Sequence, residues 1–337
     1  MAESYDALLI VSFGGPERAA DVVPFLENVV RGKNVSRERI LAVAEHYERF
    51  GGTSPLGGQV RALLASLVHE LNAHGPSLPV YWGNLHWHPL LADTLRDMAD
   101  DGIRRALAFV TSAFGSHAGC RVYLDAIERA RGEIGDKAPR VDKIRLFYNH
   151  PNFVEAVADR AAEAFGTLDE VDRDAARLVF TSHSLPVGMA RTSDYEEQLA
   201  EACRLIAKRL GRGEWRLCYQ SRSGPPSQAW LEPDLGKQII AWHEAGEVRD
   251  EALVLVPIGF LLENMELVYD LDIEIAGLCD ERGIKMARAA AAGNHPRVVE
   301  MIRLLVEERV DSSKPRLAIG DHGPSHDVCP PGCCPRG

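Results

Sequence analysis

The chain has 337 residues, of which 46% are hydrophobic and 26% are charged, a composition typical of globular rather than disordered proteins. The formal charge of −11 comes from 38 basic and 49 acidic residues. Neither sign is concentrated in a long block, which argues against nucleic acid as a partner. A chain of this length is too long for one ordinary core and suggests two domains.

Membrane insertion and export are also disfavoured. No stretch approaches the roughly eighteen uninterrupted apolar residues that a transmembrane segment requires. The N-terminus has no basic region followed by an export cleavage pattern, so we expect a cytoplasmic location. Peripheral membrane contact stays open, since segment 22–30 could form an apolar lip through which a ligand enters or could simply pack on the sheet, and packing is favoured. Nothing in the sequence indicates the oligomeric state.

Short β-branched runs alternate along the chain with longer amphipathic segments, which is the pattern of a parallel α/β fold. The expected strands are residues 6–13, 79–83, 106–112, 143–148, 177–182, 216–220, 253–258 and 285–288. The expected helices include residues 60–72, 89–100, 154–165, 195–210, 265–282 and 297–309.

Two sets of four strands predict two similar doubly wound, Rossmann-like domains with parallel sheets and a ligand cleft between them. We place the N-terminal domain at residues 1–150 and the C-terminal domain at residues 151–312. Residues 313–337, rich in Pro, Gly and Ser, are expected to form an irregular tail that contains cysteines.

Residues with chemical potential fall at the expected strand ends. An apolar run ends at His183 and is followed by helix-start residues, a suitable place for a base. Phe13 lies in a glycine-containing turn after the first strand, but the glycine spacing does not match the dinucleotide fingerprint, so an ordinary turn is the stronger interpretation. His86 and His88 flank a tryptophan after the second strand, where surface imidazoles are an equally good interpretation.

An acidic pattern follows the seventh expected strand. Glu263, Glu266, Asp270 and Glu274 recur every three or four positions and are expected to form one stripe along a helix. Solvated helix faces often have this pattern. However, the apolar residues 260–262 directly before it would raise the proton affinity of nearby carboxylates, which suits proton relay.

Several motifs resemble those of one enzyme family. They are segment 180–186 (Phe-Thr-Ser-His-Ser-Leu-Pro), segment 257–272, the Gly-Gly-Thr-Ser-Pro loop 51–55 after Tyr47, segment 220–225 and the Trp-Leu-Glu-Pro segment 230–233. Together, and in this order, they resemble ferrochelatase, which inserts ferrous iron into a porphyrin. The resemblance extends from about Tyr5 to Val310.

The resemblance implies a mechanism and a set of site residues. His183 matches the essential histidine and would accept pyrrole protons as an uncharged imidazole. Glu266 matches the facing carboxylate, so the two would meet the Fe²⁺ substrate from opposite sides of a slot as wide as a tetrapyrrole. Phe13, Tyr47, Ser54 and Trp230 match positions of the porphyrin pocket, for which core packing is the alternative, especially at Trp230.

Two positions depart from the family pattern. Asn264 stands where many relatives have histidine, which weakens any metal-delivery role there, and Glu263 is a candidate to compensate. Leu85 stands where relatives often have arginine, so propionate binding by that arginine is not carried over, and His86 is a candidate substitute.

The seven cysteines are an odd number in a long chain, which favours free thiols or metal ligation over a disulfide framework. Three of them, Cys329, Cys333 and Cys334, lie close together in the tail. By resemblance they and Cys120 would hold a 2Fe-2S cluster. Zinc bound with help from His322 or His326, a redox-sensitive end and incidental thiols are alternatives. Cys203, Cys218 and Cys279 are expected to be packed thiols.

Two other functions are compatible with the predicted architecture. A cobalt or nickel sirohydrochlorin chelatase would share the architecture but is expected to use paired histidines, which Asn264 does not support. A non-enzymatic, two-lobed haem or tetrapyrrole carrier needs no base beside a carboxylate. The resemblance implies coproporphyrin III or protoporphyrin IX as the substrate, and the turn 12–16 and the loop 50–55 look closer to those of actinobacterial-type relatives that use coproporphyrin III.

Overall fold

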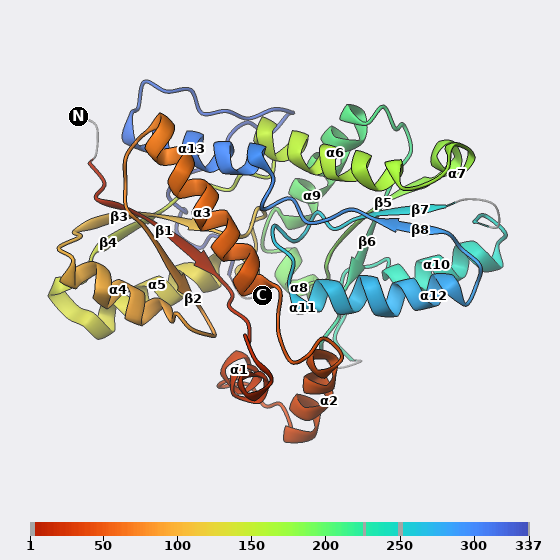
Figure 1. The fold of residues 1–337 in the computed structure, drawn as a ribbon, viewed down its shortest axis with the longest axis horizontal. Coiled ribbons are helices and arrows are strands. Elements are labelled where there is room, and N and C mark those ends of the chain that lie inside the picture. Colours follow the sequence, from red (N-terminus) through yellow and green to blue (C-terminus); the bar gives the residue numbers. More distant parts are fainter. Residues whose placement is uncertain (1–3, 225–226, 249–251, 336–337) are drawn as a thin grey trace.

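The computed structural model describes residues 4–224, 227–248 and 252–335. Two four-stranded sheets lie side by side, each with helices packed on its faces (Figure 1). All strand pairs are parallel. The strand orders, β2-β1-β3-β4 and β6-β5-β7-β8, are the same when each sheet is numbered from its first strand. The prediction of an α/β protein with two similar Rossmann-like sheets is confirmed.

The strands lie close to their expected positions. They are β1 Ala7–Ser12, β2 Val80–Asn84, β3 Arg105–Val110, β4 Arg140–Lys143, β5 Arg177–His183, β6 Arg216–Gln220, β7 Leu253–Val256 and β8 Met286–Arg288. The α-helices are α1 Val22–Val29, α2 Arg37–Glu48, α3 Leu56–His74, α4 Leu91–Asp100, α5 Val122–Ile134, α6 Pro151–Gly166, α7 Glu170–Ala175, α8 Val187–Ala190, α9 Tyr195–Arg209, α10 Leu235–Glu244, α11 Met265–Val268, α12 Ala276–Asp280 and α13 Pro296–Val310.

Both faces of the first sheet are covered, which explains why β1 is buried at every position. Ala7, Leu9 and Val11 pack with α4 and α5 on one face. Leu8 and Ile10 point to the other face and pack with α3, in a core cluster that continues into the second sheet. Because this cluster contains residues of both sheets, the division of the chain at residue 150 stays a prediction.

The fourth strand is shorter and earlier than predicted. It ends at Lys143, whereas the sequence suggested a strand at residues 143–148. The apolar residues Ile144, Leu146 and Phe147 are nevertheless buried in the core cluster shared by the two sheets. Their hydrophobicity therefore reflects burial in the core shared by the two sheets and not continued pairing in one sheet.

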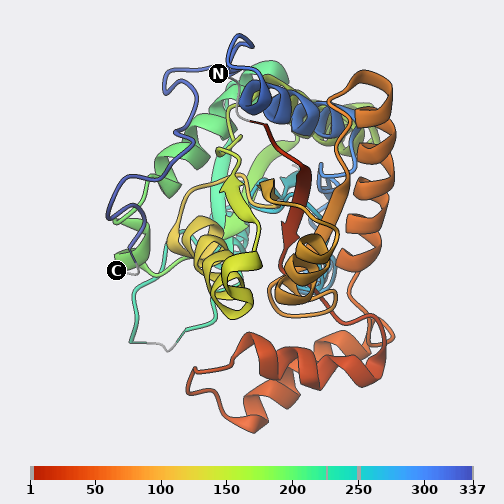
Figure 2. The same ribbon diagram turned by 90° about the vertical axis from the view of Figure 1, so that its left-hand side faces the viewer.

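The helices α1 and α2 project from the two-sheet body as a separate pair (Figures 1 and 2). Val22, Phe25 and Leu26 of this pair pack on Ile40 and Ala44 in a small core of their own. The expectation that segment 22–30 packs on a sheet is therefore wrong, because its apolar face is covered by α2. No helix in the described ranges is both long and apolar enough to cross a lipid bilayer.

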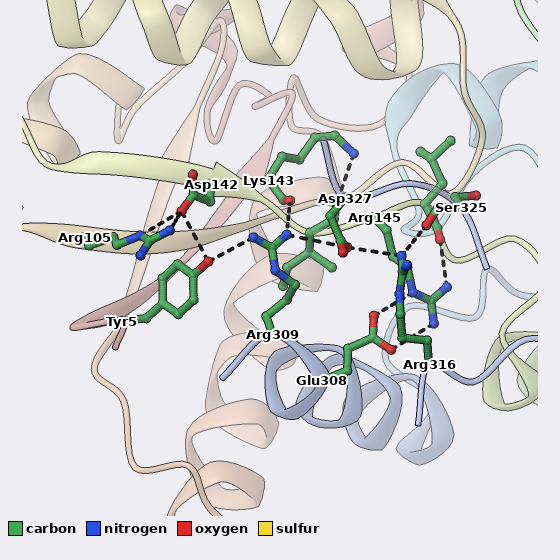
Figure 3. A network of polar contacts seen from close by, with 12 residues as sticks. Tyr5, Arg105, Asp142, Lys143, Arg145, Glu308, Arg309, Arg316, Ser325 and Asp327 are labelled. Atoms are coloured by element: carbon green, nitrogen blue, oxygen red, sulfur yellow. Dashed lines mark hydrogen bonds and ion pairs between the residues drawn. The ribbon is translucent and has the colours of Figure 1, made fainter. Parts of the chain in front are cut away.

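The tail contains no helix or strand in its described part, residues 312–335, yet it is held against the body. The N–H of Ile319 donates to the carbonyl of Asn149 at 2.9 Å. Asp327 lies within ion-pair distance of Arg309 and Arg316, at 3.5 and 3.4 Å, in the network that Figure 3 shows. The tail is irregular as predicted, but its course is fixed by polar contacts.

Candidate functional site

His183 is the last residue of β5, and the strand carries it to the carboxyl edge of the second sheet. Its Nδ1 lies 2.5 Å from the carbonyl oxygen of Ser184. A carbonyl can only accept a hydrogen bond, so Nδ1 carries a proton and Nε2 is left to face the site. The hydroxyl of Tyr195 donates to the His183 carbonyl at 2.9 Å, which fixes the backbone at this position.

Glu266 is the partner of this imidazole, because its Oε1 lies 3.3 Å from Nε2 of His183. Glu266 lies in the first turn of α11, two residues after the N-cap residue Asn264. The Oδ1 of Asn264 accepts the N–H of Leu267 at 3.0 Å and so caps the helix. Asparagine is among the residues best suited to this position. The departure from the family pattern at Asn264 therefore has a structural role.

The His183–Glu266 contact corrects one expectation. The two groups do not face each other across a slot, since 3.3 Å leaves no room for a macrocycle between them. One follows β5 and the other follows β7, and these strands are neighbours. The carboxyl ends of neighbouring parallel strands meet at one edge of a sheet. Any macrocycle that binds here would therefore lie on one side of the pair.

Asp270 is a third acidic group of the site, carried by the π-helical turn Tyr269–Ile275 (η4). Its Oδ2 accepts from Gln220 Nε2 at 3.2 Å and from the Ser221 hydroxyl. Burial and the charge of Glu266 raise the pKa of Asp270 to about 7. Such a group can take up and release a proton near neutral pH. The sequence showed Asp270 only as part of an acidic stripe, because a π-helical turn has no signal in residue spacing.

The protonation of His183 also differs from the expectation. Burial lowers the pKa of His183, but the carboxylate of Glu266, the Ser184 carbonyl and the charge of Asp270 outweigh burial and raise it to about 9. The imidazole of this structure is therefore protonated at neutral pH, not uncharged as predicted. Because this pKa is raised above 6.5, the pair stabilises the fold fully below pH 6.5, and that contribution is lost as the pH rises through 9.

Replacing Glu266 tests this account of the histidine. In Glu266→Gln the burial of His183 remains but the main opposing charge is gone, so the pKa of His183 should fall from about 9 to 6.5 or lower. Histidine NMR titration measures this value. Glu274→Gln is the matched control and should leave the titration of His183 in place. A His183 pKa near 9 in the Glu266 variant would contradict the assignment.

Glu263 is paired with residues other than His183, Glu266 and Asp270. Its Oε1 accepts from Arg288 Nη1 at 2.8 Å and from the Ala291 N–H at 2.7 Å. Since α11 begins at Met265, Glu263 precedes the helix, and the predicted four-residue stripe is wrong at this end. The contacts with Arg288 and Ala291 tie the loop to β8.

Two aromatic residues that the resemblance places in the pocket contact each other. The ring centroids of Phe13 and His86 are 4.5 Å apart, and Phe13 is 40% exposed. Burial, with a smaller effect of Lys33, lowers the pKa of His86 to about 4. A neutral imidazole carries no charge to pair with a propionate, so His86 is suited to an apolar wall and does not replace the charge of an arginine.

Helix α2, one of the two projecting helices, contacts the π-helical turn η4 that carries Asp270. The rings of His46 and Tyr269 stack with centroids 3.7 Å apart and an interplanar angle of 3°. Burial and the charge of Glu266 raise the pKa of Tyr47, which shows that Tyr47 is within electrostatic reach of that carboxylate. The structure thus brings Tyr47 to the same region as Glu266, although they lie in different domains.

Ser54 and Trp230 are two further residues predicted to line the pocket. Ser54 packs tightly on Gly15, since a Cβ at Gly15 would lie 2.7 Å from the Ser54 Cβ. Trp230 lines a pocket of about 660 Å³ together with Lys33, Pro186, Val187, Gly188, Met189, Gln228 and Ala229. This volume is typical of small-molecule sites. Because Pro186 and Val187 follow His183 closely in sequence, the pocket adjoins the end of β5.

The structure also brings together the four cysteines predicted to bind a cluster. Cys120 is buried in the π-helical turn His117–Arg121 (η2). A hydrogen bond from the Cys120 thiol lowers the pKa of Cys329. The Sγ atoms of Cys333 and Cys334 are 3.6 Å apart, and Cys333 interacts in turn with Cys329. The other cysteines, Cys203, Cys218 and Cys279, are buried in apolar surroundings as predicted.

This chain is similar to ferrochelatases over nearly the whole length of both proteins. A ferrochelatase of Rhodopirellula baltica is 54% identical over 330 residues, which cover 98% of this chain and 93% of the relative. A coproporphyrin III ferrochelatase of Mycolicibacterium smegmatis is 45% identical over 320 residues, with 94% and 93% covered. A coproporphyrin III ferrochelatase of Streptomyces coelicolor is 43% identical over 357 residues, with 99% and 94% covered.

Solved structures agree with the fold, and a family model identifies the chain. SirB from Bacillus subtilis with Fe3+ has a TM-score of 0.57 at 12% identity, over 94% of this chain and 99% of that chain. This likeness shows the shared fold alone. The ferrochelatase family model matches residues 5–310. This match and the identity to the relatives favour ferrochelatase over the two alternatives weighed above. The chain therefore belongs to the ferrochelatase family and is an enzyme that inserts iron into a porphyrin in haem biosynthesis.

Proposed function

We propose that His183, Glu266 and Asp270 together accept the two pyrrole protons that must leave before iron enters the ring. The observation that carries this proposal is the 3.3 Å contact of His183 with Glu266, beside a carboxyl group whose pKa is about 7. Three neighbouring groups with different proton affinities can pass protons from the ring toward water.

In the first step a porphyrin covers one side of the pair. Removal of water disfavours both charged forms, so the Nε2 proton of His183 moves to Glu266 and leaves a neutral imidazole. That imidazole accepts a pyrrole proton at Nε2. Glu266 passes its proton on to Asp270, which releases it to water, and a second cycle of the same relay removes the other pyrrole proton. Loss of one further proton from His183 through Glu266 and Asp270 leaves a neutral imidazole beside the carboxylate, which suits transient contact with the Fe²⁺ substrate.

We further propose that Phe13, Tyr47, Ser54, His86 and Trp230 contact the macrocycle, with residues 1–150 and 151–312 as the two lobes around it. Phe13 is exposed although it is aromatic, which suits a residue covered by a ligand. The Nε1 of Trp230 is buried without a hydrogen-bond partner among the described residues. Glu263 is a weaker candidate because it pairs with Arg288. A cytoplasmic location stays a prediction.

The proposed substrate is coproporphyrin III. It carries two more propionates than protoporphyrin IX and so needs additional cationic contacts. Lys33 lines the pocket beside Trp230 and offers such a contact. Relatives from Mycolicibacterium smegmatis and Streptomyces coelicolor are named coproporphyrin III ferrochelatases, which supports the same choice.

An anaerobic assay with ferrous iron and each porphyrin in turn tests the substrate. We expect a higher kcat/KM for coproporphyrin III, and Lys33→Ala should raise the KM for this porphyrin by about three- to tenfold because one charge-assisted contact is lost. Lys208→Ala, an exposed lysine on α9, is the control. Equal or better use of protoporphyrin IX would overturn the assignment of the substrate but not that of the reaction.

We also propose that Cys120, Cys329, Cys333 and Cys334 hold a 2Fe-2S cluster. The donor set fits, because four thiols from distant parts of the chain converge and the adjacent pair has its Sγ atoms 3.6 Å apart. Adjacent cysteines suit two irons of one cluster better than one tetrahedral ion. When bound, the cluster would supply a covalent link between the tail and η2. The visible absorption spectrum of anaerobically purified protein tests the proposal, and Cys334→Ser should lose that absorption.

A further inference from the structure

Arg288, the last residue of β8, holds two acidic side chains of one segment. Its Nε and Nη2 donate to Oδ1 and Oδ2 of Asp272 at 2.7 and 2.6 Å, which makes a bidentate ion pair. Its Nη1 donates to Oε1 of Glu263 at 2.8 Å. The side chains of Arg288, Glu263 and Asp272 are only 16%, 13% and 34% exposed. One guanidinium therefore joins the loop before α11 to the π-helical turn η4.

Glu263 and Asp272 bracket the two carboxyl groups of the proposed proton relay. Glu263 comes shortly before Glu266 in the sequence, and Asp272 comes shortly after Asp270. The strand β8 pairs with β7, the strand that leads into this segment. The segment that carries Glu266 and Asp270 is thus held at both ends by a side chain from the neighbouring strand. Its course between these ends depends on Arg288.

This segment has little regular structure of its own. The helix α11 contains four residues, and η4 is π-helical over seven. Short helices depend on tertiary contacts, and π-helical turns are rare and often lie at functional sites. Leu267 and Leu271 are buried in a core cluster of the second sheet, but apolar contacts are not directional. A bidentate arginine contact adds geometric specificity as well as energy. The polar contacts therefore fix the orientation of the acidic face.

We propose that Arg288 is a positioning residue for iron insertion, which keeps Glu266 beside His183 and Asp270 in the turn that follows. This inference rests on the proposed relay and adds a residue that does not touch the substrate. The 3.3 Å contact of Glu266 with His183 is the geometry that it maintains. Arg288 itself transfers no proton, because a guanidinium stays protonated in proteins. A lysine keeps the charge but has no planar fork for Asp272 and Glu263 together.

Arg288→Lys tests the proposal, since it retains the charge and removes the fork. We expect kcat for iron insertion to fall about 10- to 100-fold, because a small misplacement of a reacting group has an effect of this size. The KM for the porphyrin should stay within about threefold, since no substrate contact is lost. Anaerobic kinetics with ferrous iron, and with whichever of the two porphyrins the parent enzyme uses better, measure both. In a Glu266→Gln background the same substitution should lower kcat less than about threefold, because residues that act as a unit are not additive.

NMR of the imidazole nitrogens of His183 gives a readout that requires no activity. The signals of Arg288→Lys should move from those of the parent enzyme toward those of Glu266→Gln, since Glu266 no longer stays beside the ring. A role in stability alone would leave these signals of the folded protein in place. Arg282→Lys is the matched control. Arg282 follows α12 and contacts the carbonyl of Leu278 and the side chain of Glu281, so its kinetics and His183 signals should equal those of the parent.

Parent-like His183 signals or a parent-like kcat in Arg288→Lys would overturn the proposal, as would an equal loss of kcat in the Glu266→Gln background. Thermal melts check that each variant is folded. Asp272→Asn weakens the same bidentate contact from the other side and should give the same pattern, which keeps the proposal testable if Arg288→Lys does not fold. If Glu266→Gln alone keeps the parent kcat, the proposed relay fails, whereas the NMR comparison still decides whether Arg288 positions Glu266.

Discussion

His183→Ala is expected to lower kcat for iron insertion by about 10²- to 10⁴-fold, the usual contribution of a positioned acid–base group. The imidazole lies 3.3 Å from Glu266 and is held in one orientation by Ser184 and by the Tyr195 contact to its backbone. Removing it takes away the first proton acceptor, whereas the aromatic residues around the pocket remain. Porphyrin affinity should therefore stay within about threefold of the parent enzyme, since no propionate contact is lost.

Fluorescence titration with porphyrin and a stopped assay of iron insertion measure the two quantities separately. His69→Ala, an exposed residue on α3, is the control for loss of an imidazole elsewhere. If the His183 variant keeps more than a tenth of the parent kcat, His183 is not the proton acceptor. If it loses porphyrin binding instead, its main role is to hold the ligand.

The position of His183 illustrates what the sequence could predict. A buried β-branched run, ended by a polar residue and helix-start signals, locates a strand end by local patterns alone. The parallel arrangement then places His183 and the segment after β7 at one sheet edge. The separation of His183 and Glu266 could not be predicted in this way, because it depends on the capped start of α11 and on side-chain orientation.

The protonation states of the site residues could not be predicted from the sequence either. A histidine at a strand end predicts a group that titrates near neutrality, but the raised pKa of His183 depends on the Glu266 carboxylate placed 3.3 Å away. The convergence of Cys120 with the tail was predicted only by resemblance. Spacing alone cannot show that a turn after β3 meets residues more than two hundred positions later, since this contact depends on how the tail runs over the body.

The tail and His183 are connected to the same helix. Glu201 of α9 accepts the N–H of Asp321 at 2.7 Å, and Tyr195 of the same helix donates to the His183 carbonyl. Gln198, between them in sequence, accepts the N–H of Gly115 near η2. A metal centre held by the tail cysteines would thus be built on the same support as His183, which would favour a structural role for it over electron transfer in a reaction without redox change.

The buried ion pair of Arg145 with Glu308 should dominate the stability of this arrangement. Their side chains are 0% and 3% exposed, and Nε of Arg145 lies 2.6 Å from Oε1 of Glu308. Arg145 also donates to the carbonyl of Leu317 at 2.8 Å, so one guanidinium joins the residues after β4, helix α13 and the tail. Arg145→Met leaves Glu308 buried without its partner and should lower the free energy of unfolding by about 3–5 kcal/mol, the range for broken buried pairs.

Denaturant unfolding measures this loss, and a double variant separates its causes. In Arg145→Met with Glu308→Leu no charge remains buried, so most of the lost stability should return. Arg37→Met breaks an ion pair with Glu27 whose side chains are 71% and 51% exposed, and it should change stability very little. If the double variant is as unstable as Arg145→Met alone, the unpaired carboxylate is not the cause of the lost stability. The cause is then the lost contact with Leu317 and the packing of the tail.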